Sequence, residues 1–272
     1  MTDATDELRA YVDVWWEAVN DFLALLDTVP EDAWDTPTDL PGWDVRAVVA
    51  HTAHLESLIA GNEHEDVEIG DAPHARGMMG QFTEQGVVAR RDRTPDELVT
   101  EIRTSTTARH TQLLAGPPTD PAAPAPGLFG AIGWDTRTLL RNRPLDVWMH
   151  EQDVRRALAR PGGLDGPACT HAIDHLAASL GFVLAKKAQA GPGSSVLLEI
   201  EGHAPVAAVV TDQGRGLLLD ELPGEPTVGL RTDPESFLLL AGGRRRPEPG
   251  RVEIFGDTAV GQRLVDELAV TP

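Results

Sequence analysis

Apolar residues recur with a helical period through most of the first half of the sequence. They return every three or four positions over residues 7–29, and Pro30 ends that segment. The same period predicts helices over residues 44–60, 94–114 and 135–160. Four long amphipathic helices are typical of an antiparallel four-helix bundle.

Cap and turn residues mark the ends of these helices. Asp44 is placed to cap the second helix, and the run Thr94-Pro95-Asp96-Glu97 is a typical N-terminal signature for the third. The stretch 115–127 is rich in proline and alanine, which indicates a connecting loop. Residues 62–93 are expected to form a loop with one short helix.

The pattern changes after Pro161, where short apolar runs replace the long helical ones. We expect one more helix near residues 167–189. The expected strands cover residues 196–200, 205–210, 216–222, 227–230 and 251–255, and two further helices cover residues 234–241 and 258–268. Helices that flank short strands predict an α+β fold. The chain is therefore expected to have two domains, an all-α four-helix bundle over residues 1–163 and a small α+β domain over residues 164–272.

Composition narrows the class of protein. The 272 residues include 23 Lys and Arg against 43 Asp and Glu, a formal net charge of −20, which disfavours nucleic acid and anionic membranes as partners. Cys169 is the single cysteine, so no internal disulfide, zinc ribbon or CxxC redox pair can form. The N-terminus lacks the features of a signal peptide, and no apolar run approaches the roughly 20 residues of a membrane span. We expect a cytoplasmic protein, either a monomer or a homodimer.

Two histidines lie on the second expected helix. At about 100° per residue, His51 falls beside the apolar stripe of Val48 and Leu55, so it faces inward. His54 lies about 60° further toward the polar side, at the margin of the stripe. An inward histidine is more often a hydrogen-bonded core residue than a metal ligand. His51 alone therefore leaves both interpretations open.

The fourth expected helix carries a carboxylate and an imidazole on one face. Asp146 and His150 are four residues apart, and apolar residues border their face, so they are predicted to point into the bundle. Burying both groups is costly unless they are paired, hydrogen-bonded or bound to a metal. Two histidines and one carboxylate from two helices form a known catalytic metal set with open positions. The same spacing also occurs in simple structural pairs.

Four segments of the chain resemble one known family. The segments LPGWDVRAVVAHTAHL (40–55) and RPLDVWMHEQDVRRAL (143–158) resemble the mycothiol-dependent maleylpyruvate isomerase family. TDPESFLLLAGGRRR (232–246) and RVEIFGDTAVGQRLVDELAV (251–270) resemble the C-terminal half of that family. The resemblance implies a DinB-like metal-binding four-helix bundle followed by a sterol-carrier-like α+β domain.

The resemblance also assigns a metal site. The family's first metal-binding histidine corresponds to His51, and its Glu-x-x-x-His pair corresponds to Asp146 and His150. Aspartate departs from the more usual glutamate and is one methylene shorter, so a metal would have to lie closer to this helix. Asp153 matches the family pattern as well. It is expected either to orient His150 or to act as a capping or salt-bridge residue.

Outside the metal site, the resemblance assigns fewer roles. Arg244 corresponds to a family arginine near the thiol or the substrate, and Arg245 and Arg246 compete for that role. Cys169 is expected to be a small buried residue and a poor nucleophile. The catalytic residues themselves are not identified by the sequence.

The implied chemistry uses a divalent metal and a low-molecular-weight thiol. Zn²⁺ is the expected metal, although the same ligands serve nickel and iron, and mycothiol is the expected co-substrate. The cation would favour thiolate over thiol. The thiolate would then add to a conjugated double bond, which rotates before elimination, or it would be transferred to a small electrophile. Two alternatives stay open, a non-catalytic ligand- or partner-binding protein and a metal-dependent hydrolase.

Overall fold

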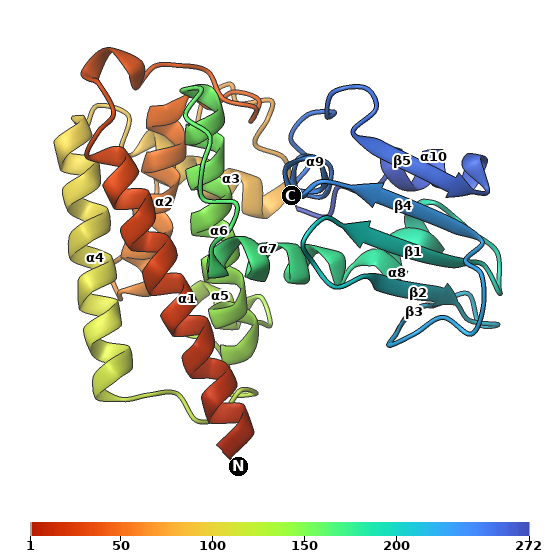
Figure 1. Cartoon of the computed structure of the whole chain (residues 1–272). Coiled ribbons are helices and arrows are strands. Elements are labelled where there is room, and N and C mark those ends of the chain that lie inside the picture. The colour runs from red at the N-terminus through yellow and green to blue at the C-terminus, as the bar shows by residue number, and fades with distance from the viewer. Residues whose placement is uncertain (1, 272) are drawn as a thin grey trace. The chain divides into compact units, whose positions relative to one another are not determined.

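The chain folds into two compact units (Figure 1). In the computed structural model, which describes residues 2–271, one unit spans Met1–Gly163 and the other spans Leu164–Pro272. The first unit is helical, and the second combines helices with a five-stranded sheet.

Four long helices build the first unit. Its elements are α1 (Thr2–Leu26), the 3-10 turn η1 (Glu31–Ala33), α2 (Val45–Ile59), α3 (Gly77–Val88), α4 (Pro95–Ala115), α5 (Gly127–Ala131) and α6 (Thr136–Ala157). The helix α1 packs against α4 and α6, and α2 packs against the same two helices, so the four enclose a shared core (Figure 1). The structure confirms each of the four predicted long helices and the short helix expected within residues 62–93. The sequence did not predict α5, because five residues are too few to show a period.

Side-chain caps set where the long helices begin. The Asp44 carboxylate accepts a hydrogen bond from the Ala47 amide at the start of α2, as predicted, and Asp135 caps α6 in the same way. Thr94 and Glu97 form a reciprocal capping box at the start of α4. Each cap satisfies amides that the helix leaves unpaired and contributes about 1 kcal/mol.

The helix α2 has almost no solvent-facing side. Twelve of its 15 residues are buried, because α3, α4 and α6 all pack against it. The prediction that His54 lies at a polar margin was wrong, since its side chain is fully buried. A helical wheel assumes one face in water, whereas α3 and its preceding loop cover that face here.

The second unit is an α+β fold with one sheet. Its elements are α7 (Pro167–Ala177), α8 (Leu180–Phe182), the π-helical turn η2 (Val183–Lys187), β1 (Ser195–Ile200), β2 (Val206–Val210), β3 (Gly216–Leu219), β4 (Val228–Thr232), α9 (Pro234–Ala241), β5 (Val252–Gly256) and α10 (Thr258–Asp266). The strand order is β3-β2-β1-β4-β5, with β1 and β4 parallel and the other pairs antiparallel. All five predicted strands are confirmed. The single helix expected over residues 167–189 is divided into three pieces.

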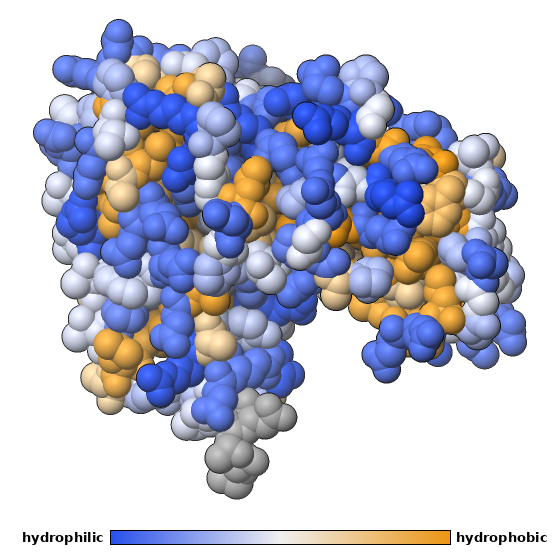
Figure 2. Space-filling model, in the orientation of Figure 1, coloured by the Kyte–Doolittle hydropathy of each residue, from blue (hydrophilic) through white to orange (hydrophobic). Residues whose placement is uncertain are grey.

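Apolar side chains collect in two places in this unit. The helical stretch Pro167–Lys187 is long and apolar enough, by length and composition alone, to cross a membrane, although no uninterrupted apolar run in the sequence indicated this. More than half of its most apolar window is buried inside the structure. The edge strand β3 leaves Leu217 and Leu218 exposed, and Figure 2 shows hydrophobic side chains gathered over the sheet.

We predict that the close approach of α8 to β3 makes Gly216 intolerant of any side chain. A Cβ atom there would lie 1.8 Å from the Gly181 carbonyl oxygen, and backbone atoms on both sides leave little room to adjust. Gly216→Ala should lower the free energy of unfolding of the second unit by about 1–3 kcal/mol. Gly224→Ala is the matched control, because a Cβ atom there meets open space. Urea denaturation of both variants checks this, and equal stabilities would contradict it.

Candidate metal centre

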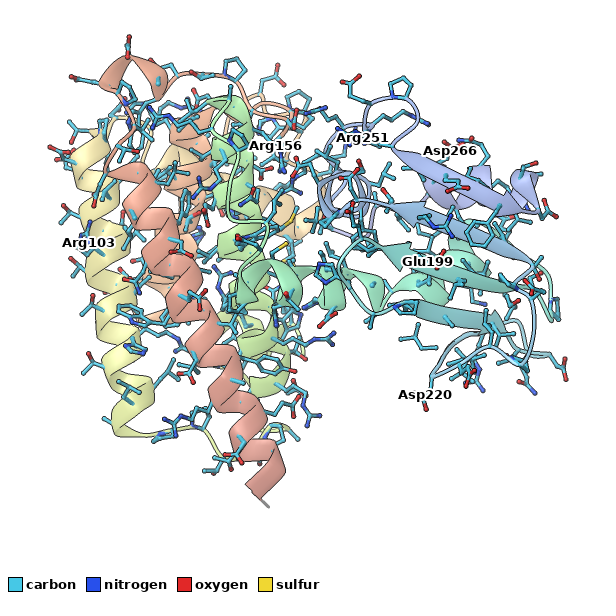
Figure 3. All side chains as sticks on the ribbon, in the orientation of Figure 1. Arg103, Arg156, Glu199, Asp220, Arg251 and Asp266 are labelled. Atoms are coloured by element: carbon cyan, nitrogen blue, oxygen red, sulfur yellow. The ribbon has the colours of Figure 1, made fainter. Side chains whose placement is uncertain are left out.

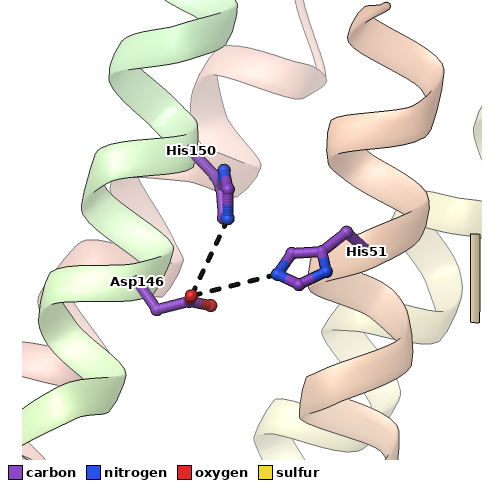
Figure 4. Close-up of side chains that lie close together, drawn as sticks. All are labelled: His51, Asp146 and His150. Atoms are coloured by element: carbon purple, nitrogen blue, oxygen red, sulfur yellow. Dashed lines mark ion pairs between the residues drawn. The ribbon is translucent and has the colours of Figure 1, made fainter. Parts of the chain in front are cut away.

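Three side chains that the sequence singled out converge between α2 and α6. His51 comes from α2, and Asp146 and His150 come from successive turns of α6 (Figure 4). The His51 and His150 side chains are 6% and 8% exposed, whereas the Asp146 side chain is 21% exposed. The group is therefore buried, apart from the part of the Asp146 side chain that remains exposed.

The spacing within this group leaves room for an ion. The Asp146 Oδ1 atom lies 3.9 Å from His51 Nε2 and 3.7 Å from His150 Nε2, too far for hydrogen bonds. Ligand atoms at the corners of a zinc tetrahedron lie about 3.4 Å apart. Although the Asp146 side chain is one methylene shorter than glutamate, its Oδ1 atom thus lies where three ligand atoms converge. The donor set of two imidazoles and a carboxylate suits a transition metal.

The local environment keeps two of these groups in the ionisation state that a metal requires. Burial lowers the pKa of His51, and the nearby Asp146 carboxylate offsets this only in part, so the imidazole is neutral at pH 7. Burial opposes ionisation of Asp146, but Arg143 and the two imidazoles outweigh it and hold the pKa of that carboxyl well below its usual range. A neutral imidazole and an ionised carboxylate are the forms that bind cations.

A buried arginine positions the carboxylate, and the sequence analysis missed it. The Arg143 guanidinium, one turn before Asp146 on α6, lies 2.9 Å from Asp146 Oδ2 and 2.6 Å from Glu56 Oε1 on α2. The Trp15 indole also donates a hydrogen bond to that Glu56 oxygen. The i,i+3 spacing of Arg143 and Asp146 was the available signal, but the pairing with Glu56 depends on how two helices pack.

Two further residues hold the imidazoles in place. Asp153 Oδ2 lies 3.2 Å from His150 Nδ1, so it can fix the orientation of that ring, and Asp153 is itself paired with Arg156 at 2.7 Å. The Trp43 ring lies 4.9 Å from the His51 ring and donates a hydrogen bond to Glu84. Trp43 therefore forms an apolar wall beside the His51 imidazole.

The remaining predicted residues lie in the second unit. Arg244 follows the end of α9 and donates a hydrogen bond to the Gly242 carbonyl, while Arg246 pairs with Asp266. The role of Arg244 beside a thiol or substrate stays a prediction. Cys169 is 1% exposed, as expected.

These features define the class of protein, a helical unit with a buried His-Asp-His group joined to an α+β unit. Two family models match consecutive parts of the chain, the mycothiol maleylpyruvate isomerase N-terminal domain over residues 15–155 and the MDMPI C-terminal domain over residues 170–263. The chain belongs to the mycothiol maleylpyruvate isomerase family, a family of enzymes.

Solved structures show the same fold. The crystal structure of the mycothiol-dependent maleylpyruvate isomerase is similar at 17% identity and a TM-score of 0.57, with 93% of each chain covered. A histidine-to-alanine variant of that enzyme is similar at 16% identity, with the same TM-score and coverage. No curated protein matches the sequence.

We predict that Arg143→Met destabilises the helical unit, because it leaves Glu56 and Asp146 charged and unpaired in the core. The expected loss is about 3–5 kcal/mol in the free energy of unfolding. Arg103→Met is the control, since Arg103 projects outward from α4 (Figure 3) and forms an exposed ion pair with Asp27. That change should cost about 1 kcal/mol or less. Denaturation with chelator present measures both, and similar losses would contradict a special role for Arg143.

We also predict that the native Cys169 thiol is unreactive. Burial, with smaller contributions from Glu235 and Asp165, raises the pKa of Cys169 to about 12. The nucleophilic thiolate is therefore almost absent at pH 8. Iodoacetamide should label the protein in urea and leave the native protein unlabelled, as mass spectrometry would show. Rapid labelling of the native protein would contradict the assignment of Cys169 as a packing residue.

Proposed function

We propose that this protein is a metal-dependent enzyme that uses mycothiol to isomerise a small unsaturated substrate, or to transfer the thiol to a small electrophile. The observation that carries the proposal is the convergence of His51, Asp146 and His150 in a member of this family. The similar solved enzyme is a mycothiol-dependent maleylpyruvate isomerase, so maleylpyruvate is the first substrate to test.

We propose that His51, Asp146 and His150 hold one divalent ion, with Zn²⁺ as the expected metal. The separations of their ligand atoms and the neutral His51 beside the ionised Asp146 support this. A bound Zn²⁺ would favour the thiolate form of the co-substrate at neutral pH. Three protein ligands leave a position open for that thiol.

The surrounding residues have separate positioning roles in this proposal. Arg143 keeps Asp146 ionised and directs its Oδ1 atom toward the two imidazoles. Asp153 accepts a hydrogen bond from His150 Nδ1, which leaves His150 Nε2 free to bind the ion. Trp43 limits the access of water along one side of the His51 ring.

The proposal also covers the fold type of each unit, the role of Arg244 and the cellular location. The pairwise packing of α1, α2, α4 and α6 supports a DinB-like four-helix bundle, and the five-stranded sheet with its helices supports a sterol-carrier-like second unit. Arg244 is proposed to contact the thiol or substrate. The protein is proposed to be cytoplasmic.

We predict that His150→Ala loses metal and mycothiol-dependent activity together. Elemental analysis of tag-free protein should show about one equivalent less metal in the variant than in the wild type. Asp153→Asn keeps the ligands but weakens the orientation of His150, so metal affinity or activity should fall by about 10–100-fold. Turnover of maleylpyruvate with and without mycothiol completes the test.

His203→Ala is the control, because His203 lies in the second unit and outside the proposed ligand set. Unchanged metal content in His150→Ala would overturn the metal site. Activity without thiol would favour a metal-dependent hydrolase instead. A protein that binds no metal even with Zn²⁺ present would favour a non-catalytic binding protein.

A further inference from the structure

A second group of possible ligands lies on another side of α2. His54 of α2 and His64 and Glu65 of the following loop place one ligand atom each within 4.8 Å of one another. The His54 side chain is fully buried, and the side chain of Glu65 is 35% exposed. This group shares no residue with His51, Asp146 and His150.

Hydrogen bonds define the protonation of the two imidazoles. The Gln85 amide nitrogen donates to Asp66 and to the Val67 carbonyl, so its Oε1 atom faces His64 Nε2 at 3.0 Å as an acceptor. His64 Nε2 is therefore the donor to Gln85, which leaves His64 Nδ1 as the nitrogen that can accept a hydrogen bond. His54 Nε2, 3.0 Å away, is then the donor to that atom.

This arrangement leaves the other nitrogen of His54 without a proton or a partner. Among residues 2–271, no group hydrogen-bonds to His54 Nδ1, which is buried. Burial, with a smaller contribution from Arg90, lowers the pKa of His54 to about 3, so the ring is neutral at physiological pH. The proton on Nε2 can thus move to Nδ1 and free Nε2 to bind a cation.

The geometry around these imidazoles suits a metal ion. Two nitrogens bound to one transition metal at about 2.1 Å lie about 3.0–3.4 Å apart. His54 Nε2 and His64 Nδ1 are 3.0 Å apart across their hydrogen bond, so a turn of the two rings that breaks this bond can direct both nitrogens to one ion without separating them. Glu65 contacts Arg90 through both oxygens, at 2.9 and 3.1 Å. Each carboxylate oxygen has two lone pairs, so Glu65 can bind an ion without releasing Arg90.

A neighbouring cleft and the local charge both favour a cation. A cleft of about 560 Å³ beside the group is lined by Phe82 and Gln85, which contact His64, and by the carboxylates Asp66 and Glu68. Five of the nine residues 63–71 are acidic. Glu101 also pairs with Arg90, so two carboxylates offset the positive charge of that arginine.

We propose that His54, His64 and Glu65 form a second site for a divalent transition-metal ion, separate from the His51–Asp146–His150 group. The ion would bind His54 Nε2 and His64 Nδ1 while the His54 proton moves to Nδ1, so no proton is released from the pair. Imidazole and carboxylate ligands suit Zn²⁺, Ni²⁺ or Cu²⁺. The site would tie the loop before α3 to the centre of the helical unit.

Zinc binding to the chelator-treated full chain tests this proposal. Equilibrium dialysis against Zn²⁺ should give about two equivalents for the wild type and about one for His64→Phe, which keeps a ring against Phe82 but removes both nitrogens. Glu65→Gln should weaken the second site while leaving the first unchanged. His203→Ala is the control for nonspecific histidine binding and should retain two equivalents.

The two proposals fail in different ways. His150→Ala should lose only the first equivalent, and the double variant with His64→Phe should bind none. If His64→Phe binds as much zinc as the wild type, the second site is overturned whatever His150→Ala does. If only His64→Phe loses an equivalent, the second site stands and the metal in the proposed function fails. Circular dichroism establishes that each variant is folded. The absorption of bound Co²⁺ in folded His150→Ala, reduced when Glu65→Gln is added, provides independent support.

Discussion

The helical unit depends on a cluster of three charged side chains between α2 and α6, namely Arg143, Glu56 and Asp146. The Arg143 guanidinium, 3% exposed, joins Glu56 on α2 to Asp146 on α6. A lone charge there would be strongly destabilising, so the three side chains are tolerated only together. Because the same two helices carry His51 and His150, the pairing that neutralises Arg143 also sets the spacing of the candidate metal ligands.

The second constraint is the complete enclosure of α2. Its side toward α6 carries His51, and its side toward α3 carries His54, so one helix contributes to two separate groups of polar residues. The close approach of α3 requires Gly86, because a Cβ atom there would lie 2.0 Å from His54 Nδ1. Buried polar groups on opposite sides of one helix need partners from several elements, and the long loop before α3 supplies one in His64.

Local interactions account for what could be predicted. The periods of apolar residues, together with cap residues such as Asp44, located the four long helices and the five strands. The i,i+4 spacing of Asp146 and His150 placed them on one face before any fold was known. The pairing of either residue with His51 could not follow from spacing. The predicted inward faces of the two helices made it one of two open interpretations, and resemblance to a family then assigned it.

The sequence by itself determined the four long helices, the five strands, the two-part organisation and the candidate residues within each helix, because these depend on contacts a few positions apart. Only the tertiary structure decided that His54 is buried, that Glu56 neutralises Arg143, and that His64 meets α2. A helical period reports which side of a helix is apolar, but it carries no information about what covers the other side. Burial of that side, and the pairing of its polar groups, arises from packing between segments that are distant in the chain.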